Sequence, residues 1–192
     1  MMNLIKIGTV VIILAGVAVA ADFRNNSWGD TPDQVRAVEG MEELKYTAYG
    51  EPYLDYAVDL ASQTNVRVLF YFTAKECLAG GRYIPSEYGY EPFQEWENIL
   101  TDKYGEPEIA DIFHSDNDFI KENYYYGGWR DVEYGVAYGH FELCRYWTVN
   151  DTYIYIELVR WDDNALAGLK YFSTVYADEF NAQSKAAARE GF

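Results

Sequence analysis

Apolar and polar residues alternate along much of the chain, which is the pattern of β-strands with one buried face. In Val66–Thr73, the first residue and every second one after it are apolar. Comparable runs predict further strands at Leu44–Tyr49, Tyr53–Leu60, Glu76–Ile84, Asp131–Tyr138, His140–Val149, Thr152–Trp161 and Leu166–Tyr176. Gly139, Asn150-Asp151 and Asp162-Asp163-Asn164 look like short turns between consecutive runs. We therefore expect an antiparallel sheet.

Helical patterns interrupt the strands at three places. Thr31-Pro32-Asp33-Gln34 is a capping box with proline at the first helical position, and Gly40 ends the helix. A second helix is predicted from Pro92 to Tyr104, where Phe93, Trp96 and Leu100 follow a helical period. The Ala-rich tail, Ala177–Arg189, is a candidate for a short final helix.

These elements predict a single α+β domain over residues 21–192, with short helices packed on one face of an antiparallel sheet. Tyr49-Gly50-Glu51-Pro52 recurs as Tyr104-Gly105-Glu106-Pro107. The repeat suggests two similar helix-plus-sheet halves, 28–86 and 92–176, and the alternatives are chance or a favoured turn.

Residues 1–20 have the pattern of a secretory signal peptide. Lys6 supplies the positive charge, an apolar run follows, and Ala18-Val19-Ala20 is a cleavage site of the A-x-A type. Cleavage near Ala20 would release a periplasmic or secreted protein with no membrane span, and the alternative is an uncleaved N-terminal anchor. No cysteine lies near the cleavage site, so the acylated residue of bacterial lipoproteins is missing.

The charge excludes two classes of partner. The 192 residues include 15 basic and 31 acidic side chains, a net charge of −16, and loss of the segment holding Lys6 leaves −17. Nucleic acids and anionic lipid surfaces both require a basic face, so neither is expected as a partner. The field of such a chain attracts basic surfaces instead.

Cys77 and Cys144 both lie in the exported part. An oxidising compartment favours a disulfide between them, and the alternative is two unpaired thiols on separate strands.

Catalytic motifs are not found. The sequence contains no G-x-S-x-G, H-E-x-x-H, P-loop or Cys-x-x-Cys pattern, and its two histidines, His114 and His140, stand apart from any nucleophile motif. Glu142 and Glu157 are the carboxylate pair to examine for glycosidase chemistry, with a solvated acidic face as the alternative. Asp116-Asn117-Asp118 with Glu122 lacks EF-hand spacing. We expect no catalytic residue, no metal and no cofactor.

Aromatic residues on the predicted strands are the most informative feature. Strand alternation puts five of them on the side opposite the core, namely Tyr71, Tyr146, Tyr153, Tyr155 and Trp161. Tyrosine and tryptophan are favoured at interfaces, although tyrosine also simply suits strands, and a helix could cover this face. Trp129, at the end of the run Tyr124–Trp129, is a sixth candidate as part of an aromatic recognition loop.

The opening Phe23–Val35, with its Trp28-Gly29 pair and short helix, resembles the start of many uncharacterised bacterial exported proteins, and Lys103–Pro107 resembles their second landmark. Both stretches are similar to the helix-then-sheet modules of the outer-membrane assembly lipoprotein (SmpA/BamE) and β-lactamase-inhibitor-protein types. The resemblance implies a binding scaffold, without implying any specific binding residue.

The sequence as a whole predicts an exported, non-catalytic module that presents an aromatic, acidic sheet face to a basic envelope or secreted protein. The alternative is a carbohydrate or small-ligand binding protein in which Trp129 and the tyrosines stack on sugar rings.

Overall fold

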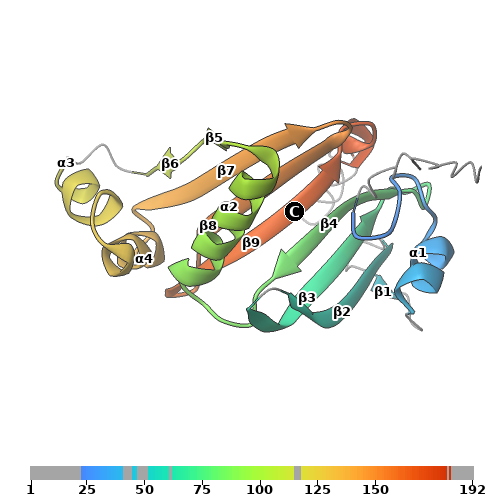
Figure 1. Ribbon diagram of the computed structural model, residues 1–192, viewed down its shortest axis with the longest axis horizontal. Coiled ribbons are helices and arrows are strands. Elements are labelled where there is room, and N and C mark those ends of the chain that lie inside the picture. The colour runs from blue at the N-terminus through green and yellow to red at the C-terminus, as the bar shows by residue number, and fades with distance from the viewer. Residues whose placement is uncertain are drawn as a thin grey trace, which may run out of the picture.

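The computed structural model describes residues 23–40, 45–46, 52–60, 62–114, 118–180 and 182, and the expected signal peptide lies outside them. In this part of the chain, nine strands form one antiparallel sheet in the order β1-β2-β3-β4-β9-β8-β7-β5, with β6 also paired to β7 (Figure 1). The strands are β1 (Lys45–Tyr46), β2 (Pro52–Leu60), β3 (Gln63–Phe72), β4 (Leu78–Ile84), β5 (Glu108–Ile109), β6 (Ile112–Phe113), β7 (Phe141–Val149), β8 (Thr152–Trp161) and β9 (Asn164–Ser173). The fold is α+β, as expected.

Two three-stranded meanders make up most of this sheet. β2-β3-β4 lies within the expected half 28–86, and β7-β8-β9 lies within the expected half 92–176. Their last strands, β4 and β9, pair at the centre, where Gly80 is opposite Phe172 and Tyr83 is opposite Leu169. The two halves therefore share one continuous hydrogen-bonded sheet.

The helical segments are α1 (Pro32–Glu39), α2 (Tyr90–Tyr104), α3 (Asp118–Ile120), the π-helix η1 (Lys121–Tyr125) and α4 (Trp129–Ala137). Thr31 and Gln34 form the predicted capping box of α1, and Gly40 ends that helix in the left-handed conformation at φ 69°. α2 ends at Tyr104, before Gly105, as predicted.

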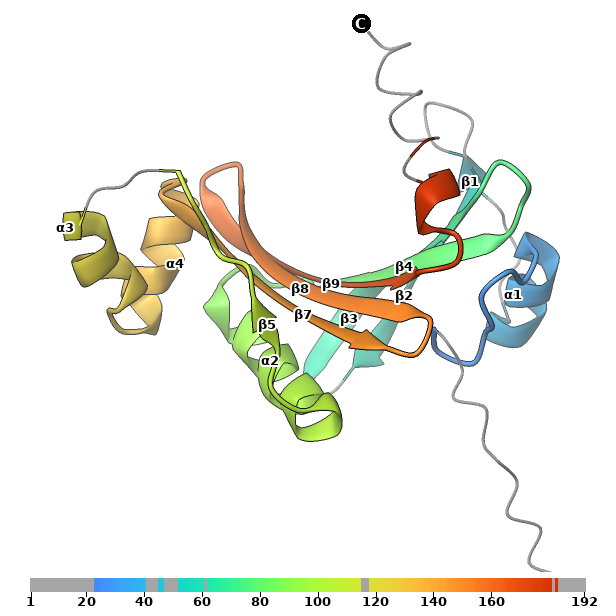
Figure 2. The ribbon, with the colours of Figure 1, turned by 90° about the horizontal axis from the view of Figure 1, so that it is seen from above.

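α2 and α4 pack on the same side of β7, β8 and β9, and α1 packs against β2. We call the side of the sheet that α2 and α4 cover the helix-covered face. α2 contributes Phe93, Trp96 and Leu100 to its core, and α4 contributes Val132 and Val136. Figure 2 shows the sheet with α2 below it.

One predicted strand is wrong. Asp131–Tyr138 lies almost entirely in α4, because Val132 and Val136 are four residues apart and meet the core from one side of a helix. Gly139 therefore follows a helix and does not close a hairpin. Part of the expected loop is helical too, since Tyr124 and Tyr125 belong to η1. Of the expected tail helix, residues 177–180 form a helical turn.

Candidate binding site

The strand register brings most of the predicted aromatic residues to one side of the sheet. On β8, Ile154 and Ile156 are buried under the helices, so Tyr153 and Tyr155 point to the opposite side. On β7, Tyr146 is the direct neighbour of Tyr155 across the strand pair. We call this side the open face, and its residues include Tyr71, Arg82, Cys144, Tyr146, Tyr153, Tyr155, Glu157, Trp161 and Lys170.

The exposed aromatic residues of this face lie on β8. Tyr153 is 45% exposed and Trp161 is 56% exposed, whereas Tyr146 and Tyr155 are half-buried. Trp129 is not brought to this group, because it begins α4 on the helix-covered face. Five of the six predicted aromatic residues therefore share one side of the sheet, and Tyr153 and Trp161 are the exposed ones among them.

Glu157 occupies the centre of the open face and is only 7% exposed. Its carboxylate accepts hydrogen bonds from Arg82 on β4, at 3.1 Å, and from Lys170 on β9, at 2.7 Å. The Lys170 ammonium also lies 5.6 Å from the ring centre of Tyr155. This cluster links both meanders across the central strand pair. Sequence reasoning missed it, although Arg82 and Lys170 are the only charges within their strands.

Tyr155 is held from its other side by a thiol. Its hydroxyl donates a 2.7 Å hydrogen bond to Sγ of Cys144, which is 1% exposed. Burial raises the pKa of the Cys144 thiol, and it also raises the pKa of the Tyr155 hydroxyl. Both groups are therefore neutral at neutral pH, and Tyr155 is a fixed part of the sheet surface.

The charges of the open face are largely paired within it. Arg67 makes two 2.8 Å hydrogen bonds to Asp55, in addition to the Glu157 cluster. By contrast, α2 on the helix-covered face carries Glu91, Glu95, Glu97 and Asp102 against the one cation Lys103. The acidic character that we expected of the open face is therefore found elsewhere on the chain.

The C-terminal helical turn covers one end of the open face. The ring of Phe180 lies 5.9 Å from that of Tyr71 and 5.9 Å from that of Phe172. Lys75, in the turn between β3 and β4, forms a 3.0 Å ion pair with Glu179. Tyr71 is therefore on the predicted side of the sheet but is covered by Phe180, which at this end matches the alternative that a helix covers this face.

Both carboxylates of the pair considered for catalysis have polar partners. Glu142 lies on the same side as Glu157, on the neighbouring strand, and its Oε1 is 3.1 Å from Nε2 of His114. His140 packs against the rings of Tyr124 and Tyr138. Among the described residues no cluster of His, Cys, Asp or Glu is arranged to hold a metal ion, and residues 116 and 117 of the acidic loop lie outside them.

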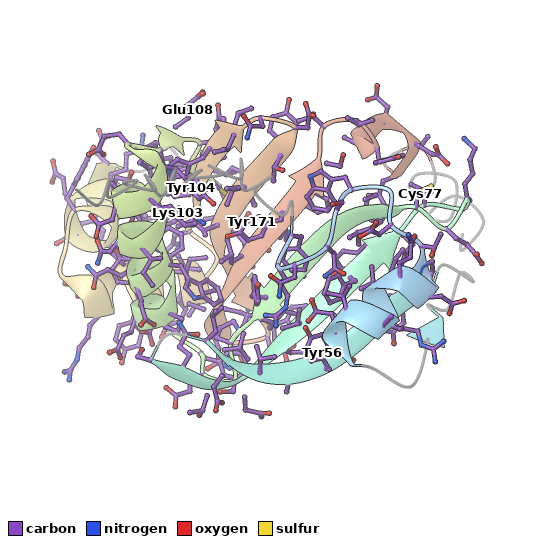
Figure 3. The ribbon with its side chains drawn as sticks, turned by 45° about the vertical axis from the view of Figure 1, so that its right-hand side comes forward. Tyr56, Cys77, Lys103, Tyr104, Glu108 and Tyr171 are labelled. Carbon is purple, nitrogen blue, oxygen red and sulfur yellow. The ribbon has the colours of Figure 1, made fainter. Side chains whose placement is uncertain are left out.

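The expected disulfide is absent, because Cys77 and Cys144 are both free. Cys77 directly precedes β4, in the turn at one end of the sheet (Figure 3), whereas Cys144 is in β7. In the sheet order, β9 and β8 lie between β4 and β7. Three strand spacings amount to about 14 Å, twice the reach of a disulfide between Cα atoms.

No family model matches this chain, and neither a curated protein nor a solved structure was found to be similar to it. None of the described helices is both long enough and apolar enough to cross a membrane.

Proposed function

We propose that the chain is an exported, non-catalytic binding protein that holds a protein partner on its open face. The observation that carries this proposal is the exposure of Tyr153 and Trp161 on the face opposite α2 and α4. Large aromatic side chains of this kind contribute most of the binding energy in many interfaces. The Glu157 cluster beside them is already hydrogen-bonded, so little ordering of the surface is needed on binding.

The partner that fits best is a basic envelope or secreted protein. A net charge of −16 for the whole chain attracts cationic surfaces over a distance. The charges of the open face are paired with one another. The long-range electrostatic attraction therefore mainly raises the association rate, and the aromatic contacts slow dissociation of the complex. Raising the salt concentration is therefore expected to slow association more than it speeds dissociation.

The direct test is a photo-crosslinking amino acid placed at Tyr153 in the expressing cell, with the same amino acid at Tyr134 as control. Tyr134 is 57% exposed but belongs to α4. A protein cross-linked from position 153 and not from position 134 is the expected result. Equal products from both positions, or none from position 153, would overturn the proposal.

A matched pair of double variants tests the energetic role. Tyr153→Ala with Trp161→Ala removes the exposed aromatic residues of the open face. Tyr134→Ala with Tyr138→Ala removes two side chains of similar exposure, 57% and 65%, from α4 and from the residue that follows it. Only the first pair should weaken binding of the cross-linked partner, by at least tenfold. Binding of polysaccharides in place of a protein would instead favour a carbohydrate-binding function.

A further inference from the structure

A single row of open-face residues crosses four strands of the sheet. Tyr71 of β3 is directly opposite Gly80 of β4. Phe172 of β9 is opposite Gly80 on one side and opposite Tyr153 of β8 on the other. Tyr153, at one end of the row, is 45% exposed and belongs to the proposed partner site. The row therefore continues that site across the central strands to β3.

The glycine leaves a slot in this row. Tyr71 and Phe172 are two strand spacings apart, about 10 Å, and Gly80 between them has no side chain. The ring of Phe180 packs against both flanking rings, with its centre 5.9 Å from that of Tyr71 and 5.9 Å from that of Phe172. Aromatic pairs at such distances attract one another. The slot therefore holds an aromatic side chain, and Phe180 is the one that it holds in this structure.

Phe180 is carried by the C-terminal turn, residues 177–180. Figure 2 shows this turn, in red, on the side of the sheet opposite α2. The chain is fixed just before it, because the backbone amides of Val175 and Tyr176 donate hydrogen bonds to Oγ of the buried Ser173, at 3.2 and 3.4 Å. The turn can therefore swing away from Tyr176 onward while β9 keeps its place in the sheet.

The contacts that hold the C-terminal turn down are easily broken. In the 3.0 Å ion pair between Lys75 and Glu179, the Lys75 side chain is 76% exposed, so water and salt weaken the attraction. Phe180 is only half-buried, and a single helical turn is not stable without its tertiary contacts. Segments of this kind open locally at a small fraction of the global free energy of unfolding. The slot can therefore be uncovered while the sheet stays folded.

We propose that the C-terminal turn is a removable cover, and that a protein partner bound at Tyr153 displaces it and places an aromatic side chain of its own between Tyr71 and Phe172. Phe180 competes with that side chain because it is tethered beside the slot. The cover therefore lowers the affinity of the open face for its partner. This role rests on the proposed function, since the slot continues the partner site.

The slot can be tested without the partner. In the full chain, Glu179→Ala with Phe180→Ala removes the ion pair and the ring contacts of the cover. The matched control, Val175→Ala with Asp178→Ala, changes two exposed residues of the same segment. The probe is a synthetic peptide with the sequence of residues 174–182, titrated into each protein while the amide resonance of Gly80 is followed by NMR.

We expect the peptide to bind the uncovered variant at least tenfold more tightly than it binds the native chain or the control variant, because the slot of those two proteins is occupied most of the time. A peptide with alanine in place of its phenylalanine should bind none of the three. The proposal is overturned if the peptide does not bind the uncovered variant, or if it binds the native chain equally well.

The second measurement uses the protein that is cross-linked from position 153. The uncovered variant should bind this partner at least fivefold more tightly than the native chain does, and the control variant should bind it as the native chain does. Equal binding by the uncovered variant and the native chain would show that the turn does not compete with the partner. That result overturns the cover and leaves the proposed function standing, whereas the absence of any partner cross-linked from position 153 overturns both.

Discussion

The hydroxyl of Tyr155 on β8 donates a hydrogen bond of 2.7 Å to Sγ of Cys144 on β7. The contact joins diagonal neighbours of the open face, because Cys144 is directly opposite Glu157 and Tyr155 is directly opposite Tyr146. It uses the hydroxyl that an interface tyrosine would otherwise offer to a partner. Tyr155 therefore helps to hold together the strand surface on which Tyr153 is exposed.

The two thiols should react at very different rates with a thiol reagent such as Ellman's reagent. Cys77 is half-exposed, whereas Cys144 is buried with a raised thiol pKa. We expect one thiol per chain to react quickly in the folded protein and the second only in denaturant. Cys77→Ser should remove the fast phase. If both thiols react quickly, Cys144 is not buried. If no thiol reacts even in denaturant, the two cysteines are joined by a disulfide after all.

Glu157→Gln should destabilise the fold by about 3 kcal/mol, because it leaves Arg82 and Lys170 without their carboxylate in a largely buried cluster. Glu142→Gln is the matched control. Its partner His114 is exposed, so its loss should cost less than about 1 kcal/mol. Urea unfolding of both variants measures the difference. Equal losses in the free energy of unfolding would show that the contacts of Glu157 stabilise the fold no more than the contact of Glu142 with His114.

Gly81→Ala should destabilise the protein by about 2 kcal/mol through overpacking. A Cβ atom at this position would lie 2.0 Å from the ring of Phe23, which is 1% exposed and packs against Phe70. At Gly128, the nearest atom to an added Cβ is 3.8 Å away. Gly128→Ala should therefore cost much less in thermal unfolding. If the two variants have the same melting temperature, the ring of Phe23 does not pack over Gly81 of β4.

Stability should fall in alkaline solution because several tyrosines are partly buried. Burial, together with a hydrogen bond to Asp111, raises the pKa of Tyr125 to about 12, and burial also raises the pKa values of Tyr56 and Tyr171. Their unfolded value is about 10, so the unfolded chain loses these protons first. The stabilisation is complete below pH about 10 and is lost as the pH rises through the folded values.

The alkaline effect can be measured by urea unfolding at a series of pH values, beside an ultraviolet titration of phenolate. Tyr125→Phe should flatten the decline, since it removes one of the raised groups. Tyr153→Phe, at an exposed residue, should leave the decline unchanged. A titration in which all tyrosines ionise together near pH 10 would rule out their burial.

The strands were predictable wherever alternation was regular. Thr152–Trp161 was predicted with the bounds that β8 has, and its alternation also placed Tyr153 and Trp161 on the open face. α1 followed from the capping box at Thr31. Local patterns suffice in these cases because strand alternation and helix caps depend on residues a few positions apart.

The errors arose where local preference and tertiary packing disagree. Asp131–Tyr138 is rich in valine and tyrosine, which favour strands, but the core selects the helical spacing of Val132 and Val136. The Glu157 cluster could not be predicted from the sequence, because its partners come from β4 and β9 and no local pattern predicts that those two strands pair. The cover that Phe180 forms over Tyr71 is equally non-local.

The central pairing of β4 with β9 has a consequence for biogenesis. β4 is made early, but its partner is the last of the described strands to leave the ribosome. Until then the first meander has a bare edge, which can recruit a strand from another chain. A protein cut short before Asn164 would keep that edge for its whole lifetime. Nonsense products of this gene should therefore accumulate as β-rich aggregates or be degraded, and should not persist as a half-sized functional domain.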